Sequence, residues 1–220
     1  MQTMKTSPTN DAGSTSGATA RGTAMRARLI EATIASIAHD GLAGASVERI
    51  TRRAGVSRGL VRHYYGAKSN LLAEAFRDLA DDFRGMLGMR DSGEPDSDRA
   101  AELRLRRAIL PMFDRLKPVP DRQYAWFGFW ALARSEPQIE RLNHALYEEI
   151  VQHLGGLVAD VARRRGRSID TAAAGRGLAA MMEGAWVHAI INVEGMSVAE
   201  AQRLSLDYVS RLLGGDIAAE

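Results

Sequence analysis

Residues 46–65, SVERITRRAGVSRGLVRHYY, contain two short helical segments separated by a glycine. Ser46 is a good N-cap for the first segment, and Glu48 in its first turn is favoured by the helix dipole. Gly55 allows a sharp turn because glycine adopts positive φ without steric cost. The second segment follows another N-cap candidate, Ser57, and is short, basic and aromatic. This pattern predicts a helix-turn-helix, whose second helix fits the major groove of DNA.

The side chains of this region are suited to DNA contacts. Arg58 and Arg62 lie four residues apart on one helix face, and arginine is the best bidentate reader of a guanine edge. Lys68 begins the next helix, where free backbone N–H groups also favour a phosphate. Further candidates for backbone contacts are Arg49, Thr51, His63 and Tyr64. Tyr64 and Tyr65 can alternatively be core aromatics of a small helical unit, and we expect Tyr65 to be buried and Tyr64 to face DNA.

The charge of the chain is unevenly distributed. Residues 21–70 carry nine Lys or Arg and three acids, so this segment has a net charge of +6. Lys5 and Asp11 cancel within residues 1–20, and the rest of the chain has 19 basic and 23 acidic residues, which is −4. A basic segment on a mildly acidic body favours a polyanion partner, although a solvated basic face is the alternative.

Composition limits the other classes of function. The chain has 220 residues and no cysteine, which excludes disulfides and thiolate metal sites. Residues 1–22 are rich in Ser, Thr and Gly, predict a disordered tail and contain no secretory signal. No apolar run is long enough to span a membrane, so we expect a cytoplasmic protein. No metal spacing, phosphate loop or catalytic triad is evident, so the sequence predicts no enzyme and no cofactor.

Hydrophobic periodicity predicts an all-α protein of about nine helices. The expected helices cover about 23–39, 47–54, 58–65, 68–83, 99–116, 122–135, 137–165, 171–193 and 197–213, with a loop at 88–98. The first three form a helix-turn-helix domain over 23–68. Residues 69–215 then form a ligand-binding and dimerisation domain, in which apolar stripes on the last two helices can build a four-helix interface across a two-fold axis.

Several residues of the predicted helix-turn-helix domain, called the head from here on, match a known family. They are ITRRAGVS at 50–57, Gly59, HYY at 63–65, Lys68 and the pair Leu71 and Leu72. With them, the stretch from Leu29 to Leu72 resembles the DNA-binding domain of the TetR family of transcriptional regulators. The resemblance implies a homodimer and DNA-facing positions for Ser57, Arg58, Arg62, Tyr64 and Lys68. The chain differs from the family pattern at Arg62, where Tyr is most frequent, and at Ala67, where a capping Ser or Asp is common.

The predicted C-terminal domain over residues 69–215, called the body from here on, is similar to one branch of that family. The segments AWFGFW at 125–130 and GLAAMMEGAW at 177–186, with Pro137 and Leu142, resemble the choline-responsive, BetI-like branch. Tryptophans attract quaternary ammonium groups by cation–π interactions, and a cage for such a cation needs a carboxylate. The candidate pocket residues are Trp126, Phe127, Trp130, Glu183 and Trp186. Alternatively the tryptophans form plain core and Glu183 faces solvent.

The predicted function is a sequence-specific, homodimeric DNA-binding regulator that binds a near-palindromic operator in double-stranded DNA. We expect a repressor that a small-molecule effector releases, although activation is open. A non-specific or architectural DNA-binding protein is the first alternative, and it would not distinguish an operator from random duplex. A helical small-molecule enzyme is the second, and it would need an acid–base pair or metal set that the sequence does not contain.

Overall fold

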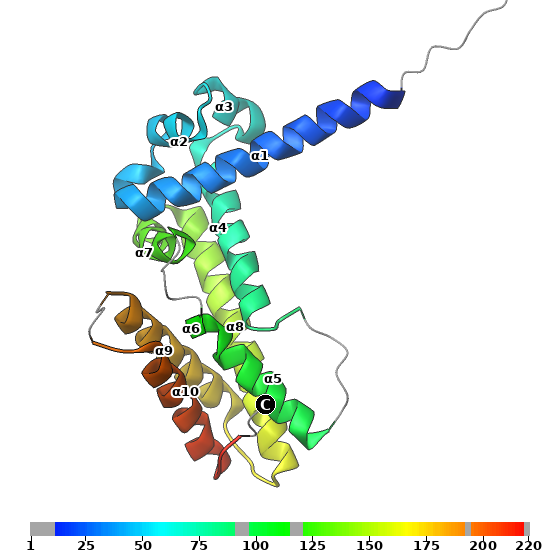
Figure 1. The fold of residues 1–220 in the computed structure, drawn as a ribbon, viewed down its shortest axis with the longest axis vertical. Coiled ribbons are helices and arrows are strands. Elements are labelled where there is room, and N and C mark those ends of the chain that lie inside the picture. Colours follow the sequence, from blue (N-terminus) through cyan, green and yellow to red (C-terminus); the bar gives the residue numbers. More distant parts are fainter. Residues whose placement is uncertain (1–11, 91–96, 115–120, 192–194, 218–220) are drawn as a thin grey trace, which may run out of the picture.

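The computed structural model describes residues 12–90, 97–114, 121–191 and 195–217, and all regular structure in these ranges is helical (Figure 1). The first half contains α1 (Ala12–Asp40), the 3₁₀ helix η1 (Gly41–Ala45), α2 (Val47–Ala54), α3 (Gly59–Tyr65) and α4 (Lys68–Met86). The second half contains α5 (Asp98–Ile109), α6 (Pro111–Asp114), α7 (Asp121–Ala133), α8 (Pro137–Arg164), α9 (Thr171–Ile191) and α10 (Val198–Leu213). The prediction of an all-α fold is confirmed.

The described residues form two hydrophobic cores, which meet along α1 and α4. The smaller core, in the head, contains Leu29, Ala32, Ile50, Ala54, Val61, Tyr65 and Leu71. The larger core runs through the body from α1 to α10. Two neighbouring residues of α4 show the division, because Leu71 belongs to the head core and Leu72 to the body core. The helix α4 therefore connects the two parts directly.

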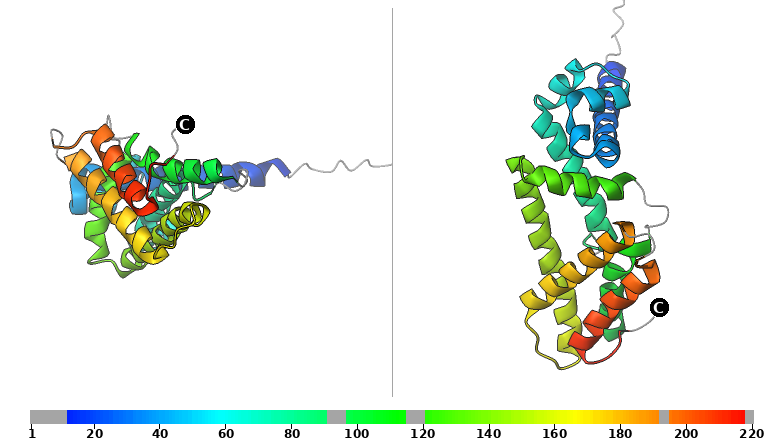
Figure 2. Two further views of the ribbon diagram at one scale, coloured as in Figure 1. Left: turned by 90° about the horizontal axis from the view of Figure 1, so that it is seen from below. Right: turned by 90° about the vertical axis from the view of Figure 1, so that its left-hand side faces the viewer.

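The helices of the body surround α8, the longest of them. Helix α7 crosses beneath the head, α8 runs down the length of the body, and α9 and α10 pack side by side on one flank (Figure 2). Pro137 stands in the first turn of α8, where its missing N–H costs nothing. Ser197 caps α10 by accepting a hydrogen bond from the Glu200 N–H at 3.1 Å. No helix in the described part of the chain combines the length and apolarity of a membrane span.

Two helix boundaries differ from the predicted ones. Helix α1 begins at Ala12 rather than near Thr23, so residues 12–22, predicted as part of a disordered tail, continue the helix. The helix predicted over 99–116 ends at Ile109, and α6 starts at Pro111. Proline removes a backbone donor and clashes with the preceding turn, which explains this interruption. The predicted end of that helix, residues 115–116, lies outside the described residues.

Candidate DNA interface and effector cavity

The turn between α2 and α3 has the geometry that the sequence predicted. Ser46 caps α2 by accepting a hydrogen bond from the Arg49 N–H at 3.3 Å. Gly55 has φ 63°, in the left-handed region, and its N–H bonds to the Arg52 carbonyl at 3.1 Å. The next residue, Val56, donates to the Thr51 carbonyl at 3.0 Å and packs against the head core. These bonds fix α3 relative to α2.

The predicted capping role of Ser57 is wrong. Helix α3 begins at Gly59, its N-cap position is Arg58, and no side chain caps it. The backbone makes a tight turn here instead, because the Ser57 carbonyl accepts from the Leu60 N–H at 3.1 Å. Ser57 remains exposed, so its hydroxyl is accessible to a DNA phosphate.

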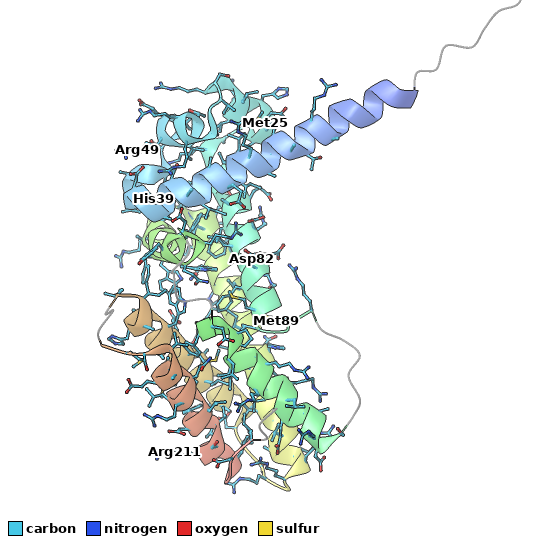
Figure 3. The ribbon with its side chains drawn as sticks, in the orientation of Figure 1. Met25, His39, Arg49, Asp82, Met89 and Arg211 are labelled. Carbon is cyan, nitrogen blue, oxygen red and sulfur yellow. The ribbon has the colours of Figure 1, made fainter. Side chains whose placement is uncertain are left out.

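Four candidate DNA residues lie exposed at the head, on α3 or beside it. They are Ser57, Arg58, Arg62 and His63. Arg58 is 3.2 Å from Glu48, whereas the ion pairs of the described residues do not include Arg62. Helix α2 contributes Arg49, which is exposed and pairs with Asp40 at 3.0 Å (Figure 3).

Thr51 is not placed as predicted. It is only 3 % exposed, and its hydroxyl donates to the carbonyls of Val47 at 2.8 Å and Glu48 at 3.3 Å. The side chain is therefore turned back onto its own helix and satisfied there, as threonine in a helix interior commonly is. We leave Thr51 out of the DNA contact set.

The two tyrosines at the end of α3 have different surroundings. Tyr65 is 8 % exposed, and its hydroxyl donates to the Arg26 carbonyl at 2.9 Å, so it is a core residue as predicted. Burial raises the pKa of its phenol. Tyr64 is half-buried, with the Arg26 guanidinium 5.5 Å from its ring centre and the His63 ring edge-on at 4.8 Å. Its ring is therefore held in place by neighbours while part of it stays accessible.

Lys68, the first residue of α4, has an acidic partner from the body. Its Nζ lies 3.3 Å from Oε1 of Glu136, and both side chains are partly exposed. Glu136 occupies the short connection between α7 and α8. A residue predicted to bind DNA phosphate is thus in contact with the domain predicted to bind an effector.

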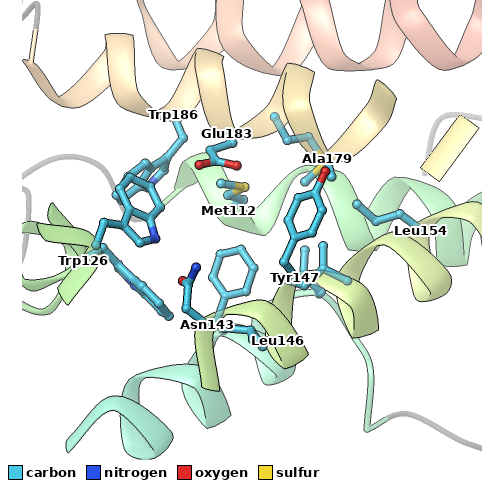
Figure 4. A pocket seen from close by; sticks show the side chains of 14 residues that line it. Met112, Trp126, Asn143, Leu146, Tyr147, Leu154, Ala179, Glu183 and Trp186 are labelled. Carbon is cyan, nitrogen blue, oxygen red and sulfur yellow. The ribbon is translucent and has the colours of Figure 1, made fainter. Parts of the chain in front are cut away.

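The body contains a cavity of about 110 Å³ between five helices (Figure 4). Its walls are mainly apolar. The lining residues are Phe83 from α4 and Leu87 directly after it, Met112 from α6, Trp126 and Trp130 from α7, Asn143, Leu146, Tyr147, Ile150 and Leu154 from α8, and Ala179, Met182, Glu183 and Trp186 from α9. A mostly apolar cavity with a few polar groups is typical of small-molecule sites.

Aromatic rings form one end of this cavity. Trp130 lies edge-on to Trp186 with ring centres 5.8 Å apart, and its centre is 6.4 Å from that of Trp126. Phe127, also predicted for the pocket, does not line it. It stacks on Trp186 from behind, with centres 5.4 Å apart. Phe127 therefore supports the wall and does not face a ligand.

The polar groups enter the cavity from opposite sides. Glu183 comes from α9, and Asn143 and Tyr147 come from α8 (Figure 4). Glu183 is exposed to solvent on one side, as one of the two sequence alternatives anticipated, and the partial burial of its carboxyl raises the pKa above its ordinary value. Among the described lining residues, Glu183 has the only carboxyl group and none is cationic. The site therefore favours a positively charged ligand.

Sequence reasoning missed Asn143 and Tyr147. They lie one turn apart on α8, directly after the apolar stripe residues Leu142 and Leu146. Their spacing could have identified them in the sequence, because residues i and i+4 share a helix face and these two lie next to a core stripe. No group of acids and histidines in the described residues has the arrangement of a metal site.

Helix α7 connects the cavity to the head. Arg122, in its first turn, lies 2.7 Å from Glu31 of α1, 2.6 Å from Asp78 and 2.7 Å from Asp82 of α4. The preceding residue, Asp121, pairs with His39 of α1 at 3.0 Å. Helix α7 carries two tryptophans of the cavity, and its first turn is bound to α1 and α4, the two helices that reach the DNA-binding head.

The same helix approaches α1 closely at a glycine. A Cβ on Gly128 would lie 2.2 Å from Cγ2 of Ile37, far inside van der Waals contact. Any larger residue at this position requires a shift of the Ile37 side chain or of one of the two helices.

These features define a class: a helix-turn-helix DNA-binding regulator with a ligand cavity in its helical body. Residues 29–75 match the protein family described as "Bacterial regulatory proteins, tetR family". Residues 101–214 match the family described as "BetI-type transcriptional repressor, C-terminal". The chain is 35 % identical to the HTH-type transcriptional regulator BetI 2 of Chromohalobacter salexigens over 189 residues, which cover 86 % of this chain and 88 % of that protein.

Solved structures have the same fold. A Pseudomonas aeruginosa PAO1 protein described as a transcriptional regulator superposes with a TM-score of 0.75 at 29 % identity, over 86 % of this chain and 90 % of its own. A Saccharomonospora viridis protein crystallised with choline has a TM-score of 0.68 at 21 % identity, over 84 % and 95 %.

The chain belongs to the TetR family of bacterial transcriptional regulators, in the branch with a BetI-type C-terminal domain. It is therefore a DNA-binding regulator of transcription and not an enzyme, as the sequence predicted.

Proposed function

We propose that this protein is a dimeric repressor that binds a near-palindromic operator and leaves it when a quaternary ammonium compound enters the cavity. The observation that carries the proposal is the cavity itself, in which three tryptophans and one carboxylate line the same space. An effector acts by binding the released state more tightly than the DNA-bound state. The contacts of α7 with both the cavity and the head provide a physical route for this difference.

The DNA contacts follow from the placement of α3. We assign base reading to Arg58 and Arg62, and phosphate contacts to Arg49, Ser57, His63, Tyr64 and Lys68. Arg62 is the strongest candidate for a base contact, since it is exposed and the ion pairs of the described residues do not engage it. Two such helices in a two-fold dimer would meet half-sites about one helical turn of DNA apart, or a multiple of it.

A face of α9 supports dimerisation through the last two helices. Small and apolar residues recur there at steps of three, four and seven, which share one helix face, at Ala173, Ala180, Gly184, Val187 and Ile191. Ile191 is 60 % exposed, and the open space around Gly184 leaves room for another helix. Packing this face with α10 against a second copy would bury the apolar surface in a four-helix interface.

The chemistry of the cavity favours a compact cation. Each cation–π contact with tryptophan contributes about 0.5–2 kcal/mol, more when water is excluded. Glu183 would neutralise the charge, and Asn143 and Tyr147 would bind a polar tail of the ligand. Choline has these groups, and the structural neighbour from Saccharomonospora viridis was crystallised with it.

Footprinting tests the proposal on DNA upstream of the protein's own gene. We expect protection of a site with two-fold symmetry, which disappears on addition of choline at a concentration that leaves a scrambled control duplex unaffected. Light scattering should give the mass of a dimer at the same protein concentration. A monomer bound to the site, or protection of every sequence alike, would contradict the proposal.

A further inference from the structure

The contact between Lys68 and Glu136 joins the DNA-binding head to the body at the first residue of α4. The two charged groups are 3.3 Å apart. Ala67, the N-cap of α4, provides no side-chain cap, so the N-terminus of this helix lacks the acceptor that a Ser or Asp would give. The helix dipole and the ammonium of Lys68 are both positive here. This end of α4 therefore attracts an anion, and in the described structure Glu136 supplies it.

Glu136 is held firmly by the backbone around it. Its N–H donates to the Leu132 carbonyl of α7 at 2.8 Å, and its own carbonyl accepts from Ile139 at 2.9 Å and Glu140 at 3.1 Å in α8. The residue is thus bonded to the end of one cavity helix and the start of another. Any movement of the corner between α7 and α8 moves the Glu136 carboxylate with it.

A DNA phosphate and the Glu136 carboxylate have the same charge and the same target. When Lys68 meets phosphate, it either leaves Glu136 or holds both anions, which then repel each other across a few ångströms. Both cases cost free energy that a neutral residue at position 136 would not cost. We propose that Glu136 is an internal competitor of DNA for Lys68, and so a positioning residue that lowers the affinity for DNA. This rests on the proposed phosphate contact of Lys68.

The location of Glu136 connects this competition to the effector. Helices α7 and α8, which meet at Glu136, carry Trp126, Trp130, Asn143 and Tyr147 of the cavity. A ligand that repositions these side chains changes how closely the carboxylate approaches Lys68. Release from DNA is then partly a transfer of Lys68 from phosphate to Glu136.

The test compares Glu136→Gln with Glu140→Gln, which removes the same charge from an exposed side chain four residues later, in the first turn of α8. Binding to a labelled duplex that spans the footprinted site is measured by fluorescence anisotropy over a range of NaCl concentrations. We expect Glu136→Gln to bind about 2- to 5-fold more tightly at low salt, the range of an exposed ion pair, and Glu140→Gln to bind like the unmodified protein.

The Lys68→Gln background identifies the target of the competition. Lys68→Gln alone should flatten the salt dependence by about one unit of slope, and adding Glu136→Gln to it should give no further gain. Equal effects of the two glutamate variants, weaker binding by Glu136→Gln, or the same gain without Lys68 would overturn the inference and leave the proposed function intact. An unchanged slope for Lys68→Gln would instead remove the phosphate contact, and the inference with it.

Choline provides the last measurement. With choline added, Glu136→Gln should lose less affinity for the duplex than Glu140→Gln does, because Lys68 then has no anionic partner at position 136. An equal loss of affinity for the duplex in both variants would show that Glu136 has no role in effector release.

Discussion

The indole Nε1 of Trp186 donates a hydrogen bond to Oε1 of Gln123 at 3.1 Å, and both residues are buried. Trp186 lines the cavity from α9, and Gln123 lies in the first turn of α7. The residue before Gln123 is Arg122, which pairs with Glu31 of α1 and with Asp78 of α4. One hydrogen bond therefore connects the wall of the cavity to the turn that holds the head.

Trp186→Phe should weaken communication between the cavity and DNA more than it weakens ligand binding. Phenylalanine keeps an aromatic face but cannot donate, so Gln123 loses its buried partner, which costs about 1–3 kcal/mol of stability. We expect the ratio of operator Kd values with and without saturating choline to fall toward one. Anisotropy titrations give this ratio, and urea unfolding gives the stability.

Trp130→Phe is the matched control for this variant. It removes a similar area of ring from the cavity but leaves the bond between Trp186 and Gln123 in place. Trp130→Phe should weaken choline binding, while the ratio of operator Kd values with and without saturating choline stays near that of the unmodified protein. If both variants reduce the ratio equally, the hydrogen bond has no special part in the coupling.

Gly128→Ala should force α7 and α1 apart. The added Cβ would meet Cγ2 of Ile37 at 2.2 Å, and a β-branched side chain packed in the core has little freedom to move. Overpacking of this kind costs about 1–3 kcal/mol, which urea unfolding measures. The double variant with Ile37→Ala should lose less free energy of unfolding than the sum of the losses in the two single variants.

A second glycine provides the comparison for Gly128. Gly156 lies on the exposed face of α8, and an added Cβ there meets nothing within 4 Å. Gly156→Ala should stabilise the protein by about 0.4–1 kcal/mol, since alanine loses less backbone entropy in a helix. If Gly128→Ala is equally stabilising, the close approach of α7 to α1 does not exist in solution.

The sequence predicted the elements of the head well, because local signals determine them. Gly55 and the apolar spacing around it specify the turn without help from the body. Thr51 was misplaced because a residue on the second helix can face either DNA or its own preceding turn, and only burial distinguishes the two. Phe127 and Trp130 were indistinguishable in sequence for the same reason, since α7 is apolar nearly all round.

The contacts that cross between distant segments were beyond the sequence. Lys68 and Glu136 are 68 positions apart in the sequence, and Arg122 is 91 positions from Glu31 and 44 from Asp78, so no helical periodicity relates these partners. Such ion pairs depend on how whole helices pack. The sequence did identify Trp126, Trp130, Glu183 and Trp186 as a possible set, and the structure brings these four to one cavity.

Arg62→Ala should relax base preference at one position of each half-site. A bidentate arginine contact to guanine contributes about 1–3 kcal/mol of discrimination, so the variant should tolerate substitutions at that position that the unmodified protein rejects. Binding to a panel of single-substitution operators measures this. Arg52→Ala, which removes an exposed arginine paired with Glu48, should keep the preference. Equal weakening on every sequence would reassign Arg62 to phosphate.

Acid should weaken choline binding through Glu183. Partial burial raises the pKa of this carboxyl, so as the pH falls toward the acid range it takes up a proton before a fully solvated glutamate would. The neutral carboxyl no longer attracts a cation, and affinity decreases as the pH falls through the raised pKa. The charged form also costs stability above that pKa, and this cost disappears below it. Calorimetric titration with choline from neutral to mildly acidic pH measures the first effect.

Glu183→Gln separates this carboxyl from other sources of pH dependence. The variant should bind choline weakly at every pH in that range, with a flat profile, and it should be more stable than the unmodified protein at neutral pH only. A sloping profile that persists in Glu183→Gln would show that a group outside the cavity titrates, and the carboxylate would lose its assigned part in recognising the cation.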